Sequence, residues 1–386
     1  MNPPPVIAST VLVLALAACG GTSAPPSAAP QASSSAVASQ SSAGAPASSV
    51  PAGASPAAAA SSQAGPAPLN PSVKVNWAVN GLIGEAGIFI AQDKGYFQQQ
   101  GLDVNLQVFH SFPDEIPLLA TGQLDYGTGG LNSDLFNAVN RNIPLRIVAA
   151  TSISRPGDAS AALLVRQDLV DSGRYKELKD LKGMSIAENS LGTSSQLFTE
   201  KILAQGGLTK DDVTFPMIPF PQMGAAMANK GIDAAFAVEP FVNGMVTKHL
   251  AKSVITGSEG FPGGINNVIV ISPVFAQRQP EAAKRIMYAF LRGHREYLAA
   301  FIDGTNPGGK DAIIQILAKH TPLKDPQQYV GMGLTSGAPD GSFDVNVLNE
   351  FQDYFVKNGT QQKKVDTAQV VDMSYIDYAV QRLGKG

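Results

Sequence analysis

One order of secondary structure occurs twice in this chain, and it limits the fold more than any other feature. Residues 73–150 alternate between the apolar patterns of strands and of helices. We expect strands at 73–79, 102–109, 124–127 and 145–150, and helices at 86–100, at 114–121 and ending near 142. Residues 183–238 repeat the plan, with strands at 183–187, 213–219 and 234–238 and helices at 196–205 and 222–229. Such alternation is typical of α/β proteins. Two copies predict two lobes, each built on a doubly wound sheet.

Two apolar segments connect these units. Residues 161–166 (AALLVR) and 267–272 (NVIVIS) have the composition of buried strands, and we predict that they cross between the lobes. This gives a first lobe of residues 73–160 plus 273–386, and a second lobe of residues 161–272 that includes the crossover strands. A long amphipathic helix is expected at 281–301, where Ile286, Phe290, Tyr297 and Phe301 share one face and should pack in the core.

The only cysteine, Cys19, follows an apolar run. Residues 6–18 (VIASTVLVLALAA) are too few to span a bilayer, and their length fits the apolar region of a secretory signal. The motif Leu16-Ala17-Ala18-Cys19 resembles the bacterial lipobox, which predicts a signal peptide at 1–18 and a diacylglyceryl group on Cys19. Two or more acyl chains on one residue anchor a protein stably. The alternative is an ordinary signal peptide with an incidental cysteine.

Residues 20–72 consist almost wholly of Ala, Ser, Pro, Gly and Gln, and the first charged residue is Lys74. A segment of this composition cannot bury enough apolar surface to fold, so residues 19–72 are predicted to be a disordered linker behind the lipidated cysteine. A coil of about 50 residues reaches roughly 40 Å. We therefore expect an extracytoplasmic body held to the bacterial cell membrane through Cys19.

Composition excludes several classes of function. With 28 Lys and Arg against 31 Asp and Glu and no basic stripe, a nucleic-acid role is not expected. The body lacks cysteine, which excludes disulfides, cysteine metal sites and thiol nucleophiles there. The four histidines (His110, His249, His294 and His320) form no metal motif, and no phosphate-binding glycine motif occurs. No metal, cofactor or catalytic group is expected, and the chain should not be an enzyme.

Ligands of open parallel sheets bind at the carboxyl ends of strands, and this rule selects the candidate site. The hydroxyl-rich loop 190–195 offers a glycine and the free N–H groups of the next helix, which suit a carboxylate, sulfonate or phosphate. Its serines could instead only cap that helix. The candidate solute contacts are Trp77, Asn80, Glu85, Asp114, Gly130, Asn132, Ser190, Gly192, Thr193, Ser194, Ser195 and Glu239.

Other candidates have an alternative role as well. Trp77, the single tryptophan, could stack on a planar ring or fill the core. Asn80 could bind a solute or close a turn. Glu85, Asp114 and Glu239 could accept from a solute N–H, or could serve only as favourable charges at helix starts.

The chain resembles the solute-binding lipoproteins of ABC importers, in the group that binds nitrate, sulfonates, taurine and thiamine precursors. The first lobe carries the resemblance in GIFIAQDKGYFQQQGLDVNLQVF and ATGQLDYG, and the second in LKGMSIAENSLGTSS, GGLTKDDV and GIDAAFAVEPF. The resemblance covers about 74–300 and implies a periplasmic-binding-protein-like fold of type II, with two doubly wound sheets joined by two crossover strands.

The same resemblance implies a function. The chain would capture a small organic solute between its lobes, as a monomer, and deliver it to ABC permease and ATPase subunits. The W-x-x-N motif of Trp77 and Asn80 is similar to that of the branch binding thiamine pyrimidines, although Ile83 replaces the histidine of that branch. Sulfonate, nitrate, pyrimidine, flavin and aromatic acid therefore remain open. The alternatives are a thiamine-pyrimidine synthase-like enzyme, disfavoured by the absence of cysteine from the body, and a membrane-tethered solute sensor.

Overall fold

The computed structural model describes residues 65–386 apart from Leu334, and these residues belong to one compact unit. The predicted signal peptide, Cys19 and the linker up to residue 64 lie outside the described residues. The end of the predicted linker is described, and there the expectation of disorder is corrected. Leu69 donates its N–H to Gln100 O at 3.0 Å. It comes this close because Gly101 has no side chain; a Cβ there would lie 2.3 Å from Leu69 N.

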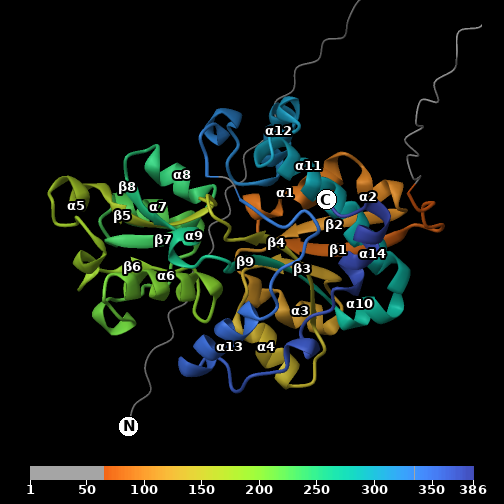
Figure 1. Cartoon of the computed structure of the whole chain (residues 1–386), viewed down its shortest axis with the longest axis horizontal. Helices are drawn as coiled ribbons and strands as arrows, with labels where there is room; N and C mark the ends of the chain where they lie inside the picture. The colour runs from red at the N-terminus through yellow and green to blue at the C-terminus, as the bar shows by residue number, and fades with distance from the viewer. Residues whose placement is uncertain (1–64, 334) are drawn as a thin grey trace, which may run out of the picture. The chain divides into compact units, whose positions relative to one another are not determined.

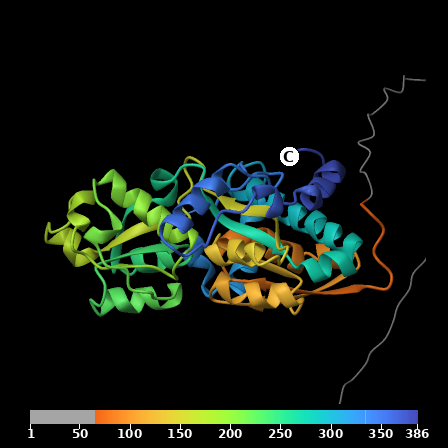
Figure 2. The ribbon, with the colours of Figure 1, turned by 90° about the horizontal axis from the view of Figure 1, so that it is seen from below.

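Two mixed sheets form the framework, as the α/β prediction requires (Figure 1). The first has the order β2 (Leu102–Val108), β1 (Val73–Val79), β3 (Tyr126–Gly129), β9 (Ile265–Ile271) and β4 (Arg146–Ile153). The second has the order β6 (Ile186–Ala187), β7 (Ala234–Val238), β5 (Ala161–Arg166) and β8 (Ala251–Thr256). We call residues 65–153 and 265–386 the first lobe, and residues 161–260 the second lobe. Figure 2 shows the two lobes side by side from a perpendicular direction.

Helices cover both faces of each sheet. The first lobe carries α1 (Ala86–Asp93), α2 (Tyr96–Gln99), α3 (Ile116–Thr121), α4 (Ser133–Asn140), α10 (Pro273–Arg278), α11 (Pro280–Phe301), α12 (Lys310–His320), α13 (Val347–Lys357) and α14 (Ser374–Leu383). The second carries α5 (Gln167–Asp171), α6 (Ser194–Gln205), α7 (Phe220–Ala228), α8 (Phe241–Val246) and α9 (Gly257–Gly260). Short 3-10 helices lie at Ile83–Glu85, Phe112–Asp114, Leu178–Leu181, Lys210–Asp212, Pro307–Gly309, Pro326–Tyr329 and Thr367–Gln369. None of the helices in the described part of the chain is both long and apolar enough to cross a bilayer.

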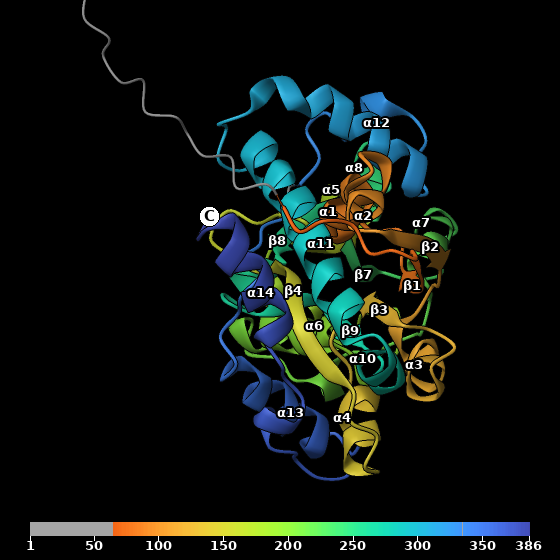
Figure 3. The ribbon, with the colours of Figure 1, turned by 90° about the vertical axis from the view of Figure 1, so that its right-hand side faces the viewer.

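The first sheet has a separate apolar core on each face. One core packs β1 against α1, α2 and α11, and Figure 3 shows α11 beside α14 on this side. Ile286, Phe290 and Tyr297 of α11 are buried there, as predicted from the helical pattern, while Phe301 is half-buried. The other core lies under α3, α4 and α13 and continues into the second lobe. A third core covers the remaining face of the second sheet with α7 and α8.

The second crossover strand lies in a different lobe from the one predicted. Residues 267–272 were expected in the second lobe, but β9 pairs antiparallel with both β3 and β4 and is central in the first sheet. β9 is apolar and buried, as a central strand of either lobe would be, so its composition does not indicate which strands it pairs with. The other predicted crossover, β5, lies between β7 and β8 in the second sheet.

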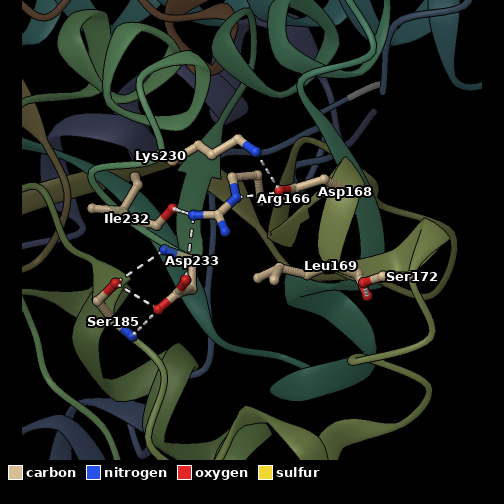
Figure 4. A network of polar contacts seen from close by, with 8 residues as sticks. All are labelled: Arg166, Asp168, Leu169, Ser172, Ser185, Lys230, Ile232 and Asp233. Atoms are coloured by element: carbon tan, nitrogen blue, oxygen red, sulfur yellow. Dashed lines mark hydrogen bonds and ion pairs between the residues drawn. The ribbon is translucent and has the colours of Figure 1, made fainter.

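A polar network fixes the base of the second sheet (Figure 4). The buried Arg166 donates to Ile232 O at 2.8 Å and pairs with Asp168 at 2.6 Å and Asp233 at 3.3 Å. Asp233 in turn accepts from the backbone N–H and the hydroxyl of Ser185, both at 3.0 Å. The ends of β5, β6 and β7 are therefore held together by charged hydrogen bonds, away from the strand ends where ligands bind.

Candidate functional site

A cleft lies between the lobes, at the carboxyl ends of the parallel strands of both sheets. The space between its walls amounts to about 1090 Å³, including a part that is open to solvent. The predicted contacts that line it are Asn80, Gly130, Ser190, Thr193, Ser194, Ser195 and Glu239. Trp77, Glu85, Asp114, Asn132 and Gly192 do not line it, and the structure gives most of these another role.

Trp77 belongs to the core, so the proposed stacking on a solute is corrected. Its side chain is 0% exposed and packs between Tyr126 and Phe97, with ring centroids 5.0 and 5.9 Å away. The indole N–H donates to Thr128 Oγ1 at 2.7 Å. Side chains alternate along β1, and the face that carries Trp77 also carries Val75 and Val79. Only the end of the strand reaches the cleft.

Glu85 closes the turn that follows β1 and has no surface on the cleft. Its carboxyl accepts from Asn80 N at 2.8 Å and from Leu82 N at 2.9 Å. Complete burial raises its pKa to about 8 despite these hydrogen bonds. Asp114 is exposed at the end of a 3-10 helix, while its neighbours Phe112 and Pro113 line the cleft.

Asn80 presents an acceptor to the cleft. Its amide Nδ2 donates to Phe109 O at 3.2 Å and to the buried Glu115 at 2.9 Å. Burial and the nearby Glu85 hold the pKa of Glu115 well above its usual range. Phe109 O can only accept a hydrogen bond, which fixes the orientation of the amide. The polar atom left for a solute is Asn80 Oδ1.

The loop 190–195 forms part of the second-lobe wall, as predicted. Thr193 precedes α6 without capping it through its side chain. Its hydroxyl donates to Ser190 O at 3.1 Å and shares a hydrogen bond of 2.9 Å with Ser195 Oγ. Ser190 Oγ is buried with no partner among the described residues. The hydroxyl of Ser190 is therefore a donor without a partner in the cleft wall.

Gly192 and Asn132 join the lobes instead of lining the cleft. Asn132 Oδ1 caps α4 by accepting from Leu135 N at 2.9 Å, and the Asn132 backbone pairs with Thr193 across the lobes. Ser133 N donates to Gly192 O at 2.8 Å, and Ser194 N donates to Leu131 O at 2.7 Å. Gly192 has φ of +64°, and a Cβ on it would lie 2.5 Å from Ser133 Oγ. The prediction that Asn132 and Gly192 contact a solute is therefore corrected, because both residues join the lobes and neither lines the cleft.

Glu239 is the acid of the cleft. It is 3% exposed, and its two carboxyl oxygens accept from Asn243 N at 2.9 Å and from Gly333 N at 3.0 Å. Burial raises its pKa to about 7. Asn243 lies in α8 and Gly333 in the first lobe, so Glu239 connects the lobes as well as lining the space between them.

Aromatic rings and amides complete the walls. The rings of Phe220 and Phe241 are half-exposed and stacked, with centroids 6.0 Å apart and planes 20° apart. Asn267 is 5% exposed, and its Oδ1 has no partner among the described residues. Sequence reasoning missed Asn267 and Phe220. A pair of asparagines at the start of an apolar strand, and a phenylalanine directly after the predicted strand 213–219, were the available signals.

The lining contains few ionisable groups. The described residues that line the cleft include one acid, Glu239, and one histidine, His110, and neither Lys nor Arg is present among them. No group of three or more His, Cys, Asp or Glu side chains in the described part of the chain is arranged to hold a metal ion. The arrangement offers hydrogen bonds and aromatic surface to a bound molecule.

Comparison with known proteins agrees with this architecture. The family model described as NMT1/THI5 like matches residues 84–300. A Brucella abortus (strain 2308) protein provisionally named a binding protein is 27% identical over 289 residues, covering 72% of this chain and 83% of the relative. One from Bacillus subtilis (strain 168), provisionally named an aliphatic sulfonates-binding protein, is 25% identical over 315 residues, covering 78% and 86%.

A solved structure shares the fold. The periplasmic nitrate-binding protein NrtA from Synechocystis PCC 6803 superposes with a TM-score of 0.66 at 15% identity, covering 83% of this chain and 90% of that one. The likeness at this identity concerns the fold. Because the family model spans more than half of the sequence, this chain belongs to the NMT1/THI5-like family.

Proposed function

We propose that this chain is the extracytoplasmic solute-binding component of an ABC importer, which captures a small organic solute between its lobes and delivers it to a membrane permease and its ATPase. The observation that supports the proposal is the cleft with walls from both lobes. The names of the relatives refer to binding of sulfonates and of nitrate, and this favours the same class of function.

Hydrogen bonds that cross between the lobes suggest how capture works. One set joins residues 131–133 to 192–194, and a second set lies at the opposite wall, where Asn243 Nδ2 donates to Gln328 O at 2.6 Å. Tyr354 OH donates to Glu200 at 2.6 Å at a third point. A solute stabilises this closed arrangement by the contacts it makes only when both walls are present. The closed form is the one that a permease would recognise.

Native mass spectrometry of the full chain, purified without refolding, tests the proposal. We expect a defined extra mass that is lost on denaturation, and a thermal midpoint that rises when the released compound is added back. A chain that carries no solute, and that no fraction of a host metabolite extract stabilises, would contradict the proposed function.

Cys19 is proposed as the lipid anchor of this component, which would act as a monomer. In cells fed radiolabelled palmitate, the wild-type chain should be labelled and remain with the membrane fraction. The Cys19→Ala chain should be unlabelled, since the acceptor thiol is missing. Equal labelling of the two chains would rule out lipidation at Cys19.

A further inference from the structure

We infer that the cleft accepts an uncharged or cationic aromatic solute that brings hydrogen-bond donors, and that it rejects sulfonate and nitrate. The inference rests on the proposed function, since it names the class of solute that this site would capture. It gives the chain a charge preference opposite to the one that the names of its relatives suggest.

Acceptors without a full set of partners belong to residues that line the cleft in both lobes. Asn80 has used both amide hydrogens inside the first lobe, which leaves Oδ1. Asn267 Oδ1 is buried and unpartnered among the described residues. The carboxyl oxygens of Glu239 each accept one backbone N–H and retain a second lone pair. A buried acceptor without a donor is costly, so a well-matched solute supplies N–H or O–H groups. Nitrate and sulfonate supply none.

Three helix N-termini around the cleft, those of α4, α7 and α8, are already occupied by acceptors of the chain itself. Glu239 accepts the N–H of Asn243 in the first turn of α8, and Asn132 does the same for α4. At the start of α7, Phe220 N donates to Asn189 Oδ1 at 3.2 Å, and the next residue is Pro221, which has no N–H. These are the positions at which an anion would otherwise bind. With neither Lys nor Arg among the described lining residues, only the start of α6 and its hydroxyls remain for an acceptor group of the solute.

The shape and apolarity of the walls favour a planar ring. The stacked Phe220 and Phe241 leave part of their surface exposed at the cleft, and Phe112 contributes another ring from the first lobe. Aromatic faces attract cations and planar rings, and they are electrostatically unfavourable to anions. The solute would lie against these rings with its donors toward Asn80, Asn267 and Glu239.

Three probes that share one ring and differ in charge test this inference on the full chain. They are benzamide, which is neutral with N–H donors, benzylamine, which is a cation, and benzenesulfonate, an anion without donors; nitrate is the fourth probe. Thermal unfolding and calorimetric titration are run up to about 10 mM of each. We expect benzamide and benzylamine to raise the unfolding midpoint with concentration, and benzenesulfonate and nitrate to leave it unchanged.

Variants identify the groups responsible. Glu239→Gln should weaken benzylamine at least tenfold and benzamide much less, because the charge is lost while an acceptor remains. Asn267→Ala should weaken both probes by a similar factor, and it keeps the test open if Glu239→Gln lowers folding yield. The control is Glu259→Gln, since Glu259 also accepts a backbone N–H at a helix start, from Thr256 at 2.8 Å, but lies outside the cleft. It should leave both affinities unchanged.

The outcomes separate the solute class from the proposed function. Binding of benzenesulfonate or nitrate at least as tight as that of benzamide overturns the inference and leaves the importer proposal standing. The charge of a solute released from the full chain on denaturation is a second test: an acid overturns the inference, and an amine or amide supports it. A chain that binds none of the four probes and releases no solute overturns the proposed function, and the inference with it.

Discussion

Replacing Gly192 with alanine should open the lobes. Gly192 has φ of +64°, which costs a non-glycine residue roughly 1–2 kcal/mol in any arrangement of the lobes. The new Cβ would also lie 2.5 Å from Ser133 Oγ and 3.2 Å from Thr360 Cβ, both in the first lobe. Relief of such overpacking is worth about 1–3 kcal/mol, and separating the lobes provides it.

The overpacking falls on the closed form alone, whereas the backbone cost is the same in both forms. The ratio of closed to open molecules should therefore drop by a factor of about 5 to 150, and the apparent affinity for any captured solute should fall with it. Pulsed electron resonance between spin labels at Arg174 and Lys324, which are exposed in different lobes, measures this ratio directly in a Cys19→Ala background.

Gly207→Ala is the matched control. Gly207 follows α6 in the same lobe with φ of +71°, and a Cβ there meets nothing within 4 Å. Both variants should lose similar stability from the backbone term, but only Gly192→Ala should lengthen the distance between the labels. Equal distance distributions in the two variants would refute the argument that residue 192 governs closure.

Three further changes test other parts of the structure. Glu188 is fully buried, and burial raises its pKa from 4.5 to about 8, so the free energy of unfolding should fall by on the order of 4 kcal/mol as the pH rises through that window. Denaturant titrations of the wild type and of Glu188→Gln at pH 5 and pH 8 measure this fall. The variant should lose less free energy of unfolding between the two pH values than the wild type does, and an equal loss in both proteins would exclude the contribution of Glu188. Arg166→Met leaves Ile232 O and Asp233 without their cation and should cost about 2–3 kcal/mol in the same assay; a neutral result would show that the network is dispensable. Trp77→Phe should cost about 1–3 kcal/mol of stability and leave the affinity for the co-purified solute unchanged, whereas a large loss of affinity would place Trp77 in the site after all.

The α/β architecture was visible in the sequence because it depends on local signals. Gly101 and Gly122 end their helical segments with positive φ, at the positions where the helical pattern stops. The lobe to which a strand belongs is a different kind of property. β9 and β5 are both largely apolar and buried, yet one is central in the first sheet and the other in the second. Their pairing depends on partners more than 60 residues away, such as Val268 with Gly129, and no local pattern encodes that choice.

The strand-end rule located the cleft but did not separate residues on its wall from residues behind it. Asn80 and Glu85 belong to one turn, and the amide reaches the cleft while the carboxyl folds back to accept the N–H groups of that turn. Trp77, the single tryptophan, lies next to the same turn and was also a candidate to contact a solute. The alternation of side chains along β1, which places Trp77 with Val75 and Val79, was the available argument against it.

The kind of solute is the least accessible from sequence, because it depends on which polar atoms remain unpaired after folding. A loop with four hydroxyls at a helix start suggests an anion site, and the loop does line the cleft. Its first helical N–H, however, is taken by Leu131 O, and Glu239, one of the acidic candidates, accepts the N–H of Asn243 in the first turn of α8. The folded walls leave acceptors at Asn80, Asn267 and Glu239, besides the unpartnered hydroxyl of Ser190. Two homologous clefts with similar strand-end loops can therefore select solutes of opposite charge, if one pairs its donors internally and the other leaves them for the ligand.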